Sequence, residues 1–276
     1  MLQSSGQSSP QSSSASFSSR RASSVASVAL VTGAGRGIGR AVALRFAAES
    51  TAAARWGVGV LARSVAEVRA TCADVERAGG VALPLIADVS EEAAAERAVA
   101  ELAAAFGAID VLVNNAGLFR VAPLATTETA TWRALLGTNL DGPFFITRAV
   151  VRRMLAHGDD SRADPREGRR GRSIVNVSSD AGKKGFPGST GYCVTKYGLC
   201  GFGDALRLEL RPHGVRVINV LPGQVDTRAW DGCGLDLEKL GIRRERMLRP
   251  EKVAEAIVCA ALGEGASADE ILLNAP

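Results

Sequence analysis

The stretch Thr32-Gly33-Ala34-Gly35-Arg36-Gly37-Ile38-Gly39 decides the fold of this chain. It joins an apolar run, Val28–Val31, which predicts a strand, to a helical stretch over residues 37–49. Glycines at such a turn let the backbone approach a pyrophosphate, and the start of the helix offers free N–H groups and the positive end of its dipole. The spacing departs from the strict G-x-G-x-x-G pattern, and glycines also serve tight packing. The turn therefore indicates a dinucleotide site but needs support from the rest of the chain.

Short apolar runs and helical stretches alternate from residue 28 to the end of the chain. Beyond the first strand, we expect strands at Val58–Leu61, Val81–Ile86, Asp110–Val113, Ser173–Val177, Val215–Val220 and Glu270–Leu273. Further helices are expected after the second strand through residue 78, and over residues 91–106, 128–156, 190–211 and 250–262. This alternation predicts an α/β fold. We expect a Rossmann-type, doubly wound parallel sheet of about seven strands with helices on both faces, formed by residues 28–276 as a single domain.

Residues 1–27 have a composition that cannot form a core. They are rich in serine, carry Arg20 and Arg21, and contain no Asp or Glu. Such a segment is expected to be disordered, and its composition fits a transit peptide. A low-complexity tail or a misassigned start is the alternative. A transit peptide would place the protein in an organelle, a chloroplast or a mitochondrion, and without one the expected location is the cytoplasm.

Two internal segments interrupt the alternation. Residues 157–172 (HGDDSRADPREGRRGR) are polar, with acidic residues among the arginines, and predict a surface loop. Residues 226–249 lie between the sixth strand and the next helix and carry Trp230, Cys233 and several glycines. We expect this second segment to be a lid over a substrate.

Composition argues against several classes of function. The net charge of the 276 residues is +4, and the arginine excess sits in short segments without interleaved aromatic residues, so no nucleic-acid partner is expected. No run of 18 apolar residues occurs, which argues against a membrane span. Two histidines cannot supply a His-based metal cluster, so no metal is expected. The five cysteines are widely spaced without a C-x-x-C pair, which is typical of reduced thiols inside a cell.

Tyr192 and Lys196 are a candidate acid/base pair. A spacing of four residues on the predicted helix places both side chains on one face, about 5–6 Å apart at Cβ. A phenol has a pKa near ~10, too high for efficient proton transfer at neutral pH, and a fixed ammonium ion beside it lowers that pKa. The pair then becomes a general acid/base. Two solvated neighbours on an exposed helix face are the ordinary alternative.

Five motifs in order along the chain carry a resemblance to a known family. They are T-G-x-x-x-G-x-G at residues 32–39, Asn114-Asn115-Ala116-Gly117 after the fourth strand, Asn139 on the long helix, Ser179 thirteen residues before Tyr192, and Pro222-Gly223-Gln224-Val225-Asp226-Thr227 after the sixth strand. With these motifs, residues 28–276 resemble the classical branch of the short-chain dehydrogenase/reductase family.

The resemblance implies a chemistry for each motif. Hydride would pass between a nicotinamide and a carbonyl carbon, and Tyr192 would give or take the proton on the oxygen. Lys196 would lower the pKa of Tyr192 and bind the nicotinamide ribose. Ser179, rather than its neighbour Ser178, would hydrogen-bond the substrate oxygen, and Asn139 would bend its helix and hold a water that links Lys196 to solvent. The implied cofactor-binding residues are Gly33, Gly35, Arg36, Gly37, Ile38, Gly39, Arg63, Asp88, Val89, Asn115, Ala116, Gly117, Tyr192, Lys196, Pro222, Gly223, Val225 and Thr227.

The end of the second strand bears on the choice between NAD and NADP. An acidic residue there would bind the ribose hydroxyls and repel a 2′-phosphate. The position is Ala62, followed by Arg63, and Arg36 lies in the glycine turn. Both arginines offer a charge-assisted contact to a 2′-phosphate. We therefore predict that NADP(H) is favoured over NAD(H), and the resemblance implies that Asp88 contacts the adenine.

The favoured function is an NADP(H)-dependent oxidoreductase that acts on a small-molecule carbonyl or secondary alcohol. A 3-oxoacyl-[acyl-carrier-protein] reductase is the alternative. It would need a basic patch for an acidic carrier, for which Lys183, Lys184 and Arg243–Arg249 are candidates. A catalytically silent sensor or scaffold on the same fold is a third hypothesis, although it has no need of a tuned phenol. The resemblance also implies a homodimer or homotetramer whose interface uses helices 128–156 and 190–211, with no membrane partner.

Overall fold

The computed structural model describes residues 25–156, 171–263 and 268–275. Residues 1–24 and 157–170 lie outside the described residues, so the expected disorder of the Ser-rich segment and the expected surface loop remain predictions. Within the described part of the chain, no helix combines the length and the apolar character needed to span a bilayer.

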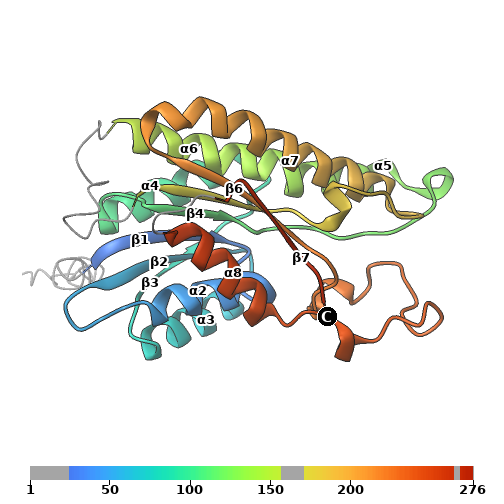
Figure 1. Cartoon of the computed structure of the whole chain (residues 1–276), viewed down its shortest axis with the longest axis horizontal. Helices are drawn as coiled ribbons and strands as arrows, with labels where there is room; N and C mark the ends of the chain where they lie inside the picture. Colours follow the sequence, from blue (N-terminus) through green and yellow to red (C-terminus); the bar gives the residue numbers. More distant parts are fainter. Residues whose placement is uncertain (1–24, 157–170, 264–267, 276) are drawn as a thin grey trace, which may run out of the picture.

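One parallel sheet of seven strands organises the molecule, in the order β3-β2-β1-β4-β5-β6-β7 (Figure 1). The strands are β1 (Val25–Thr32), β2 (Arg55–Ala62), β3 (Val81–Ile86), β4 (Val111–Asn114), β5 (Ser173–Val177), β6 (Arg216–Pro222) and β7 (Glu270–Leu273). The α-helices are α2 (Gly37–Ala48), α3 (Val65–Arg77), α4 (Glu92–Phe106), α5 (Thr129–Leu136), α6 (Gly142–Ala156), α7 (Thr190–Leu210) and α8 (Pro250–Leu262). The predicted fold class is confirmed, and β3, β5 and β7 have the predicted bounds.

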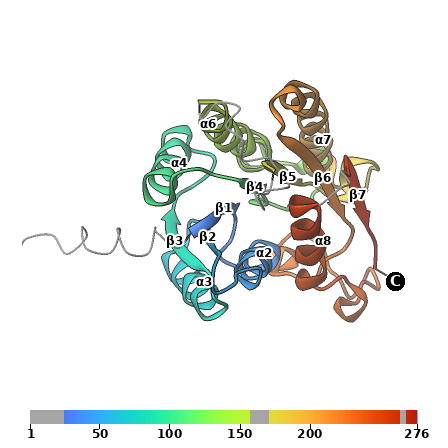
Figure 2. The ribbon, with the colours of Figure 1, turned by 60° about the vertical axis from the view of Figure 1, so that its left-hand side comes forward.

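Helices cover both faces of the sheet (Figure 2). Helices α2, α3 and α8 pack on one face, and α4, α6 and α7 pack on the other. In β1, Ala29 and Val31 belong to the first core, whereas Val28 and Leu30 belong to the second. Because alternate residues of a strand face opposite sides, a strand that is buried on both faces has a continuous apolar sequence.

β1 begins earlier than predicted. Val25 pairs with Arg55 of β2, and a register shift separates Val25 from Ser27. Val25 also packs, partly buried, against the second core. Residues 25–27 therefore belong to the folded domain and not to the Ser-rich segment, because pairing with β2 orders them.

The chain changes direction at β1. It runs outward from β1 to β2 and β3, and then returns to place β4 on the other side of β1. In open parallel sheets such a switch point leaves a crevice at the carboxyl ends of the strands, where ligands bind. The glycine turn that follows β1 and the Asn-Asn-Ala-Gly motif that follows β4 both lie at this crevice.

The helix predicted over residues 128–156 is present as one continuous run of helical turns, but a π-helical segment, Gly137–Asp141, separates α5 from α6 within it. Pro143 lies just beyond this segment, and proline has no N–H for the helical ladder, which is one established cause of such a break. Asn139 lies inside the segment and is 1% exposed. The buried side-chain amide of Asn139 therefore lies in an irregular turn and not in a regular α-helix.

Three buried asparagines in register hold helix α7 against the sheet. Asn114 of β4 donates to Asn176 of β5 at 3.0 Å, and Asn176 donates to Asn219 of β6 at 3.3 Å. Asn219 in turn donates to the Cys200 carbonyl oxygen of α7 at 3.1 Å. This network fixes the position of α7, which carries both Tyr192 and Lys196.

Candidate active site

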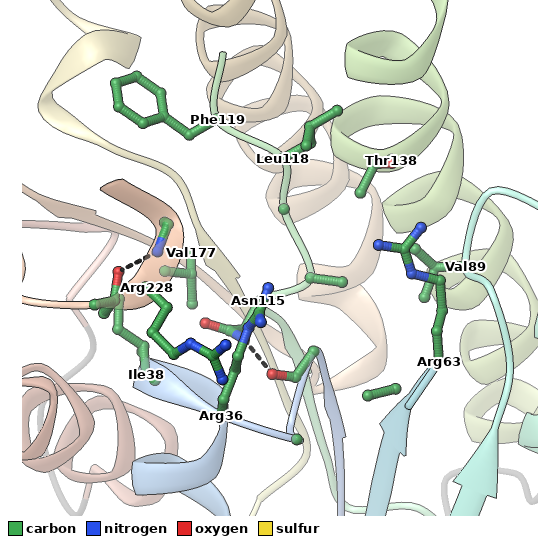
Figure 3. Close-up of a pocket in the computed structure, with 18 of the residues that line it drawn as sticks. Arg36, Ile38, Arg63, Val89, Asn115, Leu118, Phe119, Thr138, Val177 and Arg228 are labelled. Atoms are coloured by element: carbon green, nitrogen blue, oxygen red, sulfur yellow. Dashed lines mark hydrogen bonds between the residues drawn. The ribbon is translucent and has the colours of Figure 1, made fainter. Parts of the chain in front are cut away.

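A groove of about 630 Å³ lies at the carboxyl ends of the strands (Figure 3). Most of the residues that the sequence assigned to the cofactor line it: Gly33, Gly35, Arg36, Gly37, Ile38, Arg63, Asp88, Val89, Asn115, Ala116, Gly117, Tyr192, Lys196 and Thr227. The motifs thus converge from six different parts of the chain on one cavity.

Four predicted cofactor residues lie behind this lining and position it. Gly39 packs so closely that a Cβ there would overlap the Gly33 carbonyl oxygen and the Asn115 amide. Pro222 ends β6, and the Gly223 N–H donates to the Leu273 carbonyl oxygen at 2.7 Å. Val225 is buried, and its carbonyl oxygen accepts from the Trp230 indole at 2.8 Å. Their role in the described structure is to shape the groove wall.

The glycine turn requires glycine at particular positions. Gly33 and Gly37 have φ values of +64° and +55°, in the left-handed region that favours glycine. Helix α2 then begins without a side-chain cap and without an acidic residue in its first turn. Its free N–H groups and the positive end of its dipole therefore remain available to an anion in the groove.

Asn115 holds the glycine turn against β4. Its backbone N–H and that of Ala116 both donate to the Thr32 hydroxyl at 3.0 Å, and its side-chain amide donates to the Thr32 carbonyl oxygen at 2.9 Å. The two motifs that flank the switch point are therefore rigidly joined, which preorganises the groove.

Arg63 lies at the end of β2 (Figure 3), and its Nη1 is 3.4 Å from Asp88 Oδ2. Partial burial by itself raises the pKa of the Asp88 carboxyl, but hydrogen bonds from the Ser90 hydroxyl and backbone N–H, together with Arg63, outweigh burial and lower that pKa below its ordinary value. Asp88 therefore remains an anion that orients Arg63 at the groove.

The sequence patterns did not predict four charged residues that line the groove: Glu67, Arg120, Arg228 and Asp231. Glu67, in the first turn of α3, and Arg228, just after the Pro222–Thr227 motif, both line the cavity. The Oε1 atom of Glu67 lies 3.5 Å from Nη1 of Arg36 and 3.5 Å from Nη1 of Arg228. The sequence did hold a signal for Glu67, because Ser64 caps α3 and Ser-x-x-Glu is a capping box. The direction in which the Glu67 side chain points was not predictable from that pattern.

Lys196 is buried beside Tyr192. Its side chain is on the same face of α7, its Nζ lies 5.7 Å from the Tyr192 ring centroid, and it donates to the Val177 carbonyl oxygen at 2.9 Å. Because the site is desolvated, burial lowers the pKa of Lys196 from 10.5 to about 8. The solvated-neighbour alternative is wrong, because Lys196 is only 5% exposed.

The pKa of Tyr192 does not move in the predicted direction. Burial raises it well above its ordinary value, a hydrogen bond with the Ser179 hydroxyl lowers it by less, and the nearby Asp180 carboxylate raises it further. Lys196 is not among the groups that shift this pKa, and its Nζ donates to the Val177 carbonyl oxygen. Tyr192 therefore keeps its proton at neutral pH in this structure.

The structure separates the two serine candidates. The Ser178 hydroxyl donates to the Lys196 carbonyl oxygen at 3.1 Å and so fastens α7 to the end of β5. Ser179 interacts with Tyr192, and its hydroxyl donates to Asp180 Oδ1 at 3.0 Å. Ser178 lines the groove while Ser179 does not, but the hydroxyl of Ser178 is already engaged, so the geometry favours Ser179 as the partner of Tyr192.

Asn139 joins two walls of the site. Its Oδ1 accepts from the Leu118 N–H at 2.7 Å, and its Nδ2 donates to the Leu118 carbonyl oxygen at 2.9 Å and to the Thr195 hydroxyl at 3.0 Å. The predicted bend in its helix is present as the π-helical segment. Because both amide hydrogens are donated to protein groups, the side chain acts here as a brace between residue 118 and α7.

An aromatic cluster that the sequence did not predict covers Tyr192. The Phe119 ring lies edge-on to Tyr192 at 4.8 Å and to Trp230 at 5.3 Å between ring centroids. Trp230 belongs to the segment over residues 226–249, and the Val121 N–H donates to the Cys233 carbonyl oxygen of the same segment at 2.7 Å. The segment that we expected to be a lid thus packs against the loop that follows β4, beside the reactive end of the groove.

Comparison with known proteins agrees with this geometry. The sequence pattern described as short chain dehydrogenase matches residues 27–236. This chain belongs to the short-chain dehydrogenase family. It is 37% identical over 164 residues to the sorbitol dehydrogenase of Cereibacter sphaeroides, a match that spans 59% of this chain and 59% of that enzyme.

Solved structures of the same family superpose well on the chain. A 3-ketoacyl-ACP reductase from Sinorhizobium meliloti 1021 has a TM-score of 0.75 and 33% identity, covering 90% of this chain and 97% of that one. A metagenomic short-chain oxidoreductase in complex with NADP has a TM-score of 0.73 and 31% identity, covering 91% of this chain and 98% of that one.

Among the described residues, no cluster of three or more His, Cys, Asp or Glu side chains could hold a metal ion.

Proposed function

We propose that this protein is an NADP(H)-dependent oxidoreductase that transfers hydride between the nicotinamide and a carbonyl or secondary alcohol, with Tyr192 as the general acid/base. The observation that carries the proposal is that Tyr192 and Lys196 line one end of the groove that the glycine turn forms, with Ser179 beside it in hydrogen-bond contact with Tyr192. Family membership and the NADP complex of a structural neighbour support it.

The groove fits a nicotinamide dinucleotide. Its glycines expose backbone, helix α2 presents free N–H groups, and Arg36 and Arg63 offer positive charge for phosphates. These residues, with Asp88, Asn115 and the Tyr192–Lys196 pair, would hold the cofactor. When bound, the cofactor supplies or accepts the hydride.

The residues of the chain would handle the proton. In carbonyl reduction, Tyr192, which is protonated at neutral pH, donates its phenolic proton to the substrate oxygen. The Ser179 hydroxyl would turn from Asp180 to donate a hydrogen bond to the same oxygen and stabilise the charge that develops there. Lys196 would turn its ammonium group from the Val177 carbonyl oxygen toward Tyr192, where the positive charge favours the phenolate left behind. In alcohol oxidation the same proton returns to Tyr192.

Replacement of Tyr192 by phenylalanine tests this assignment. We expect the variant to lose about 10²- to 10⁴-fold in kcat for NADPH-dependent reduction of a panel of ketones, with an unchanged Kd for NADPH. Tyr197→Phe is the matched control, because Tyr197 lies on the same helix and is exposed. Near-normal turnover of the Tyr192→Phe enzyme would refute the proposed mechanism. Loss of turnover would also argue against a silent sensor or scaffold.

The preference for NADP(H) needs its own measurement. A comparison of kcat/KM with NADPH and NADH, on one ketone, tests it, and an equal or higher value with NADH would overturn the preference. Ala62 at the end of β2 and the two arginines support the proposal, whereas the nearby Glu67 carboxylate acts against it.

A 3-oxoacyl-[acyl-carrier-protein] reductase is the second candidate, and the structural similarity to a 3-ketoacyl-ACP reductase favours it. Carboxylates partly neutralise the basic patch that such a reductase would need for its acidic carrier protein. Lys183 pairs with Glu270 at 2.7 Å, Lys184 pairs with Asp180 at 3.1 Å, and Arg244 pairs with Asp226 and Asp231. Turnover of 3-oxoacyl thioesters that exceeds turnover of simple ketones would favour this candidate.

Assembly and location are part of the proposal. We infer a homodimer or homotetramer that uses α6 and α7, because Phe144, Val194, Tyr197 and Leu208 on these helices expose large apolar surfaces. Light scattering on the purified protein measures the assembly state. An organelle location follows if residues 1–27 are a transit peptide, and the cytoplasm is proposed otherwise. A fluorescent fusion of the full chain tests the choice.

A further inference from the structure

Glu67 and Arg228 bridge the two walls of the cofactor groove. Glu67 stands at the start of α3, close to the glycine turn, so that a Cβ on Gly35 would lie 3.2 Å from Glu67 Oε2. Arg228 comes from the segment over residues 226–249 on the opposite wall. Figure 3 shows its guanidinium beside that of Arg36, and one carboxylate oxygen of Glu67 serves both.

The charges at this bridge are unequal. Two guanidinium groups share the single Glu67 carboxylate, and the nearby Asp231 is more weakly placed, with its Oδ2 4.0 Å from Arg228 Nε and its Oδ1 paired with Arg244. The Arg36 and Arg228 side chains are 55% and 68% exposed, and ion pairs at such exposure contribute little. Arg36, Arg228 and Glu67 together therefore carry one net positive charge, and a stronger anion can replace the Glu67 carboxylate.

A phosphate is the anion that such a pair of arginines binds best, because the planar guanidinium matches phosphate oxygens bidentately. We propose that Arg228 is a cofactor-binding residue that leaves Glu67 and pairs with a phosphate of the nicotinamide cofactor, and that Glu67 is the carboxylate which this phosphate displaces. The proposal rests on the proposed function, since it takes the ligand to be NADPH or NADH. The phosphate is either the 2′-phosphate, which only NADPH carries, or the pyrophosphate, which both cofactors carry.

If Arg228 exchanges Glu67 for a phosphate, mutations at the two positions should have coupled effects on cofactor binding. A role of Arg228 in packing alone would not produce this coupling. In the wild-type protein, Arg228 must break its ion pair with Glu67 before it can bind the phosphate. The net free energy that Arg228 contributes to cofactor binding is smaller for that reason. Removing the Glu67 charge removes that competition. Loss of Arg228 should therefore cost more affinity when Glu67 has already been replaced by glutamine.

The test is a double-mutant cycle on cofactor binding. Kd values for NADPH and NADH are measured by calorimetry for the wild-type protein, Arg228→Gln, Glu67→Gln and the double variant. We expect Arg228→Gln to weaken NADPH binding about tenfold, because a charge-assisted contact is lost. Glu67→Gln should tighten it about two- to fivefold, as expected from loss of an exposed competing pair. Arg246→Gln is the matched control, since Arg246 is an exposed arginine of the same segment.

The NADH measurements separate the two phosphates. Weakening of NADPH binding alone assigns Arg228 to the 2′-phosphate, and equal weakening of both cofactors assigns it to the pyrophosphate. An Arg228→Gln effect below twofold would overturn the proposal, as would an effect of the same size with and without Glu67. Weaker binding of NADH by Glu67→Gln would instead mean that Glu67 holds a ribose hydroxyl. Absence of ketone turnover, or a preference for NADH, would refute the proposed function while leaving the binding cycle interpretable.

Discussion

Lys196 is a buried charged side chain, with 5% exposure. We expect its replacement by methionine to change the stability of the protein and the activity of the enzyme in opposite directions. Methionine has nearly the same length and a similar helix propensity, so it fills the same space on α7. The change removes the ammonium group and its hydrogen bond to the Val177 carbonyl oxygen. We expect a more stable protein that no longer turns over its substrate.

The magnitude follows from the cost of burying the charge. A fall in the pKa of Lys196 from 10.5 to about 8 corresponds to about 3.4 kcal/mol, at about 1.4 kcal/mol per pH unit. Part of this gain is lost, because the Val177 carbonyl oxygen loses its partner at a cost of about 1–2 kcal/mol. The free energy of unfolding should therefore rise by about 1.4–2.4 kcal/mol at pH 7. Tm should rise by about 2–4 °C for each kcal/mol.

The gain should depend on pH in one direction. Between pH 8 and pH 10.5 the unfolded chain still binds the lysine proton that the native protein has released, so wild-type stability rises with pH across this window. The methionine variant lacks this contribution. Its advantage over the wild-type protein should be full below about pH 8 and should reverse above about pH 10.5, where only the lost hydrogen bond to the Val177 carbonyl oxygen remains.

Calorimetric unfolding of both proteins at pH 7 and pH 10, at one protein concentration, measures the effect, and an NADPH-oxidation assay measures turnover. Lys239→Met is the control, because the Lys239 side chain is 84% exposed and its loss should change stability by less than about 0.5 kcal/mol. A Lys196→Met protein that is less stable than the wild type at pH 7 would refute the reasoning. So would a stability difference that is the same at both pH values.

Three further perturbations test the geometry of the site. Gly39→Ala should abolish NADPH binding in a fluorescence titration, because its Cβ would overlap the carbonyl oxygen of Gly33. Asn139→Ala removes three buried hydrogen bonds and should lower the free energy of unfolding by about 2–4 kcal/mol in a denaturant titration, and a loss below about 1 kcal/mol would contradict the bracing role. Asp180→Asn removes a negative charge that raises the pKa of Tyr192, so the rise of alcohol oxidation with pH should move to lower pH. An unchanged profile of kcat against pH would contradict that electrostatic role.

Much of the fold was predictable because buried parallel strands have a simple pattern. β3, β5 and β7 have the predicted bounds, since each is a short apolar run that follows a helix in the sequence. The π-helical form of the segment between α5 and α6 was not predictable, although the family resemblance implied a bend at Asn139. It depends on a buried amide, Asn139, whose partners at residues 118 and 195 lie far away in the sequence.

The parts of the candidate site that were predictable are those formed by a short motif within one turn or one helix. The glycine turn and the Tyr192–Lys196 pair belong to this class, because φ angles and the helical repeat are local properties. Ser179 was distinguished from Ser178 by spacing, and the tertiary hydrogen bonds then gave a physical reason for that choice.

By itself, the sequence determined the doubly wound sheet, the family and the positions of the motifs, because these depend on apolar periodicity and on short-range backbone geometry. Only the tertiary structure decided the electrostatics. Burial raises the pKa of Tyr192 and lowers that of Lys196. Glu67 on α3 pairs with Arg228, which lies 161 residues later in the sequence. Desolvation and charge pairing depend on which groups surround a side chain in space, and the order of residues along the chain does not contain that information directly.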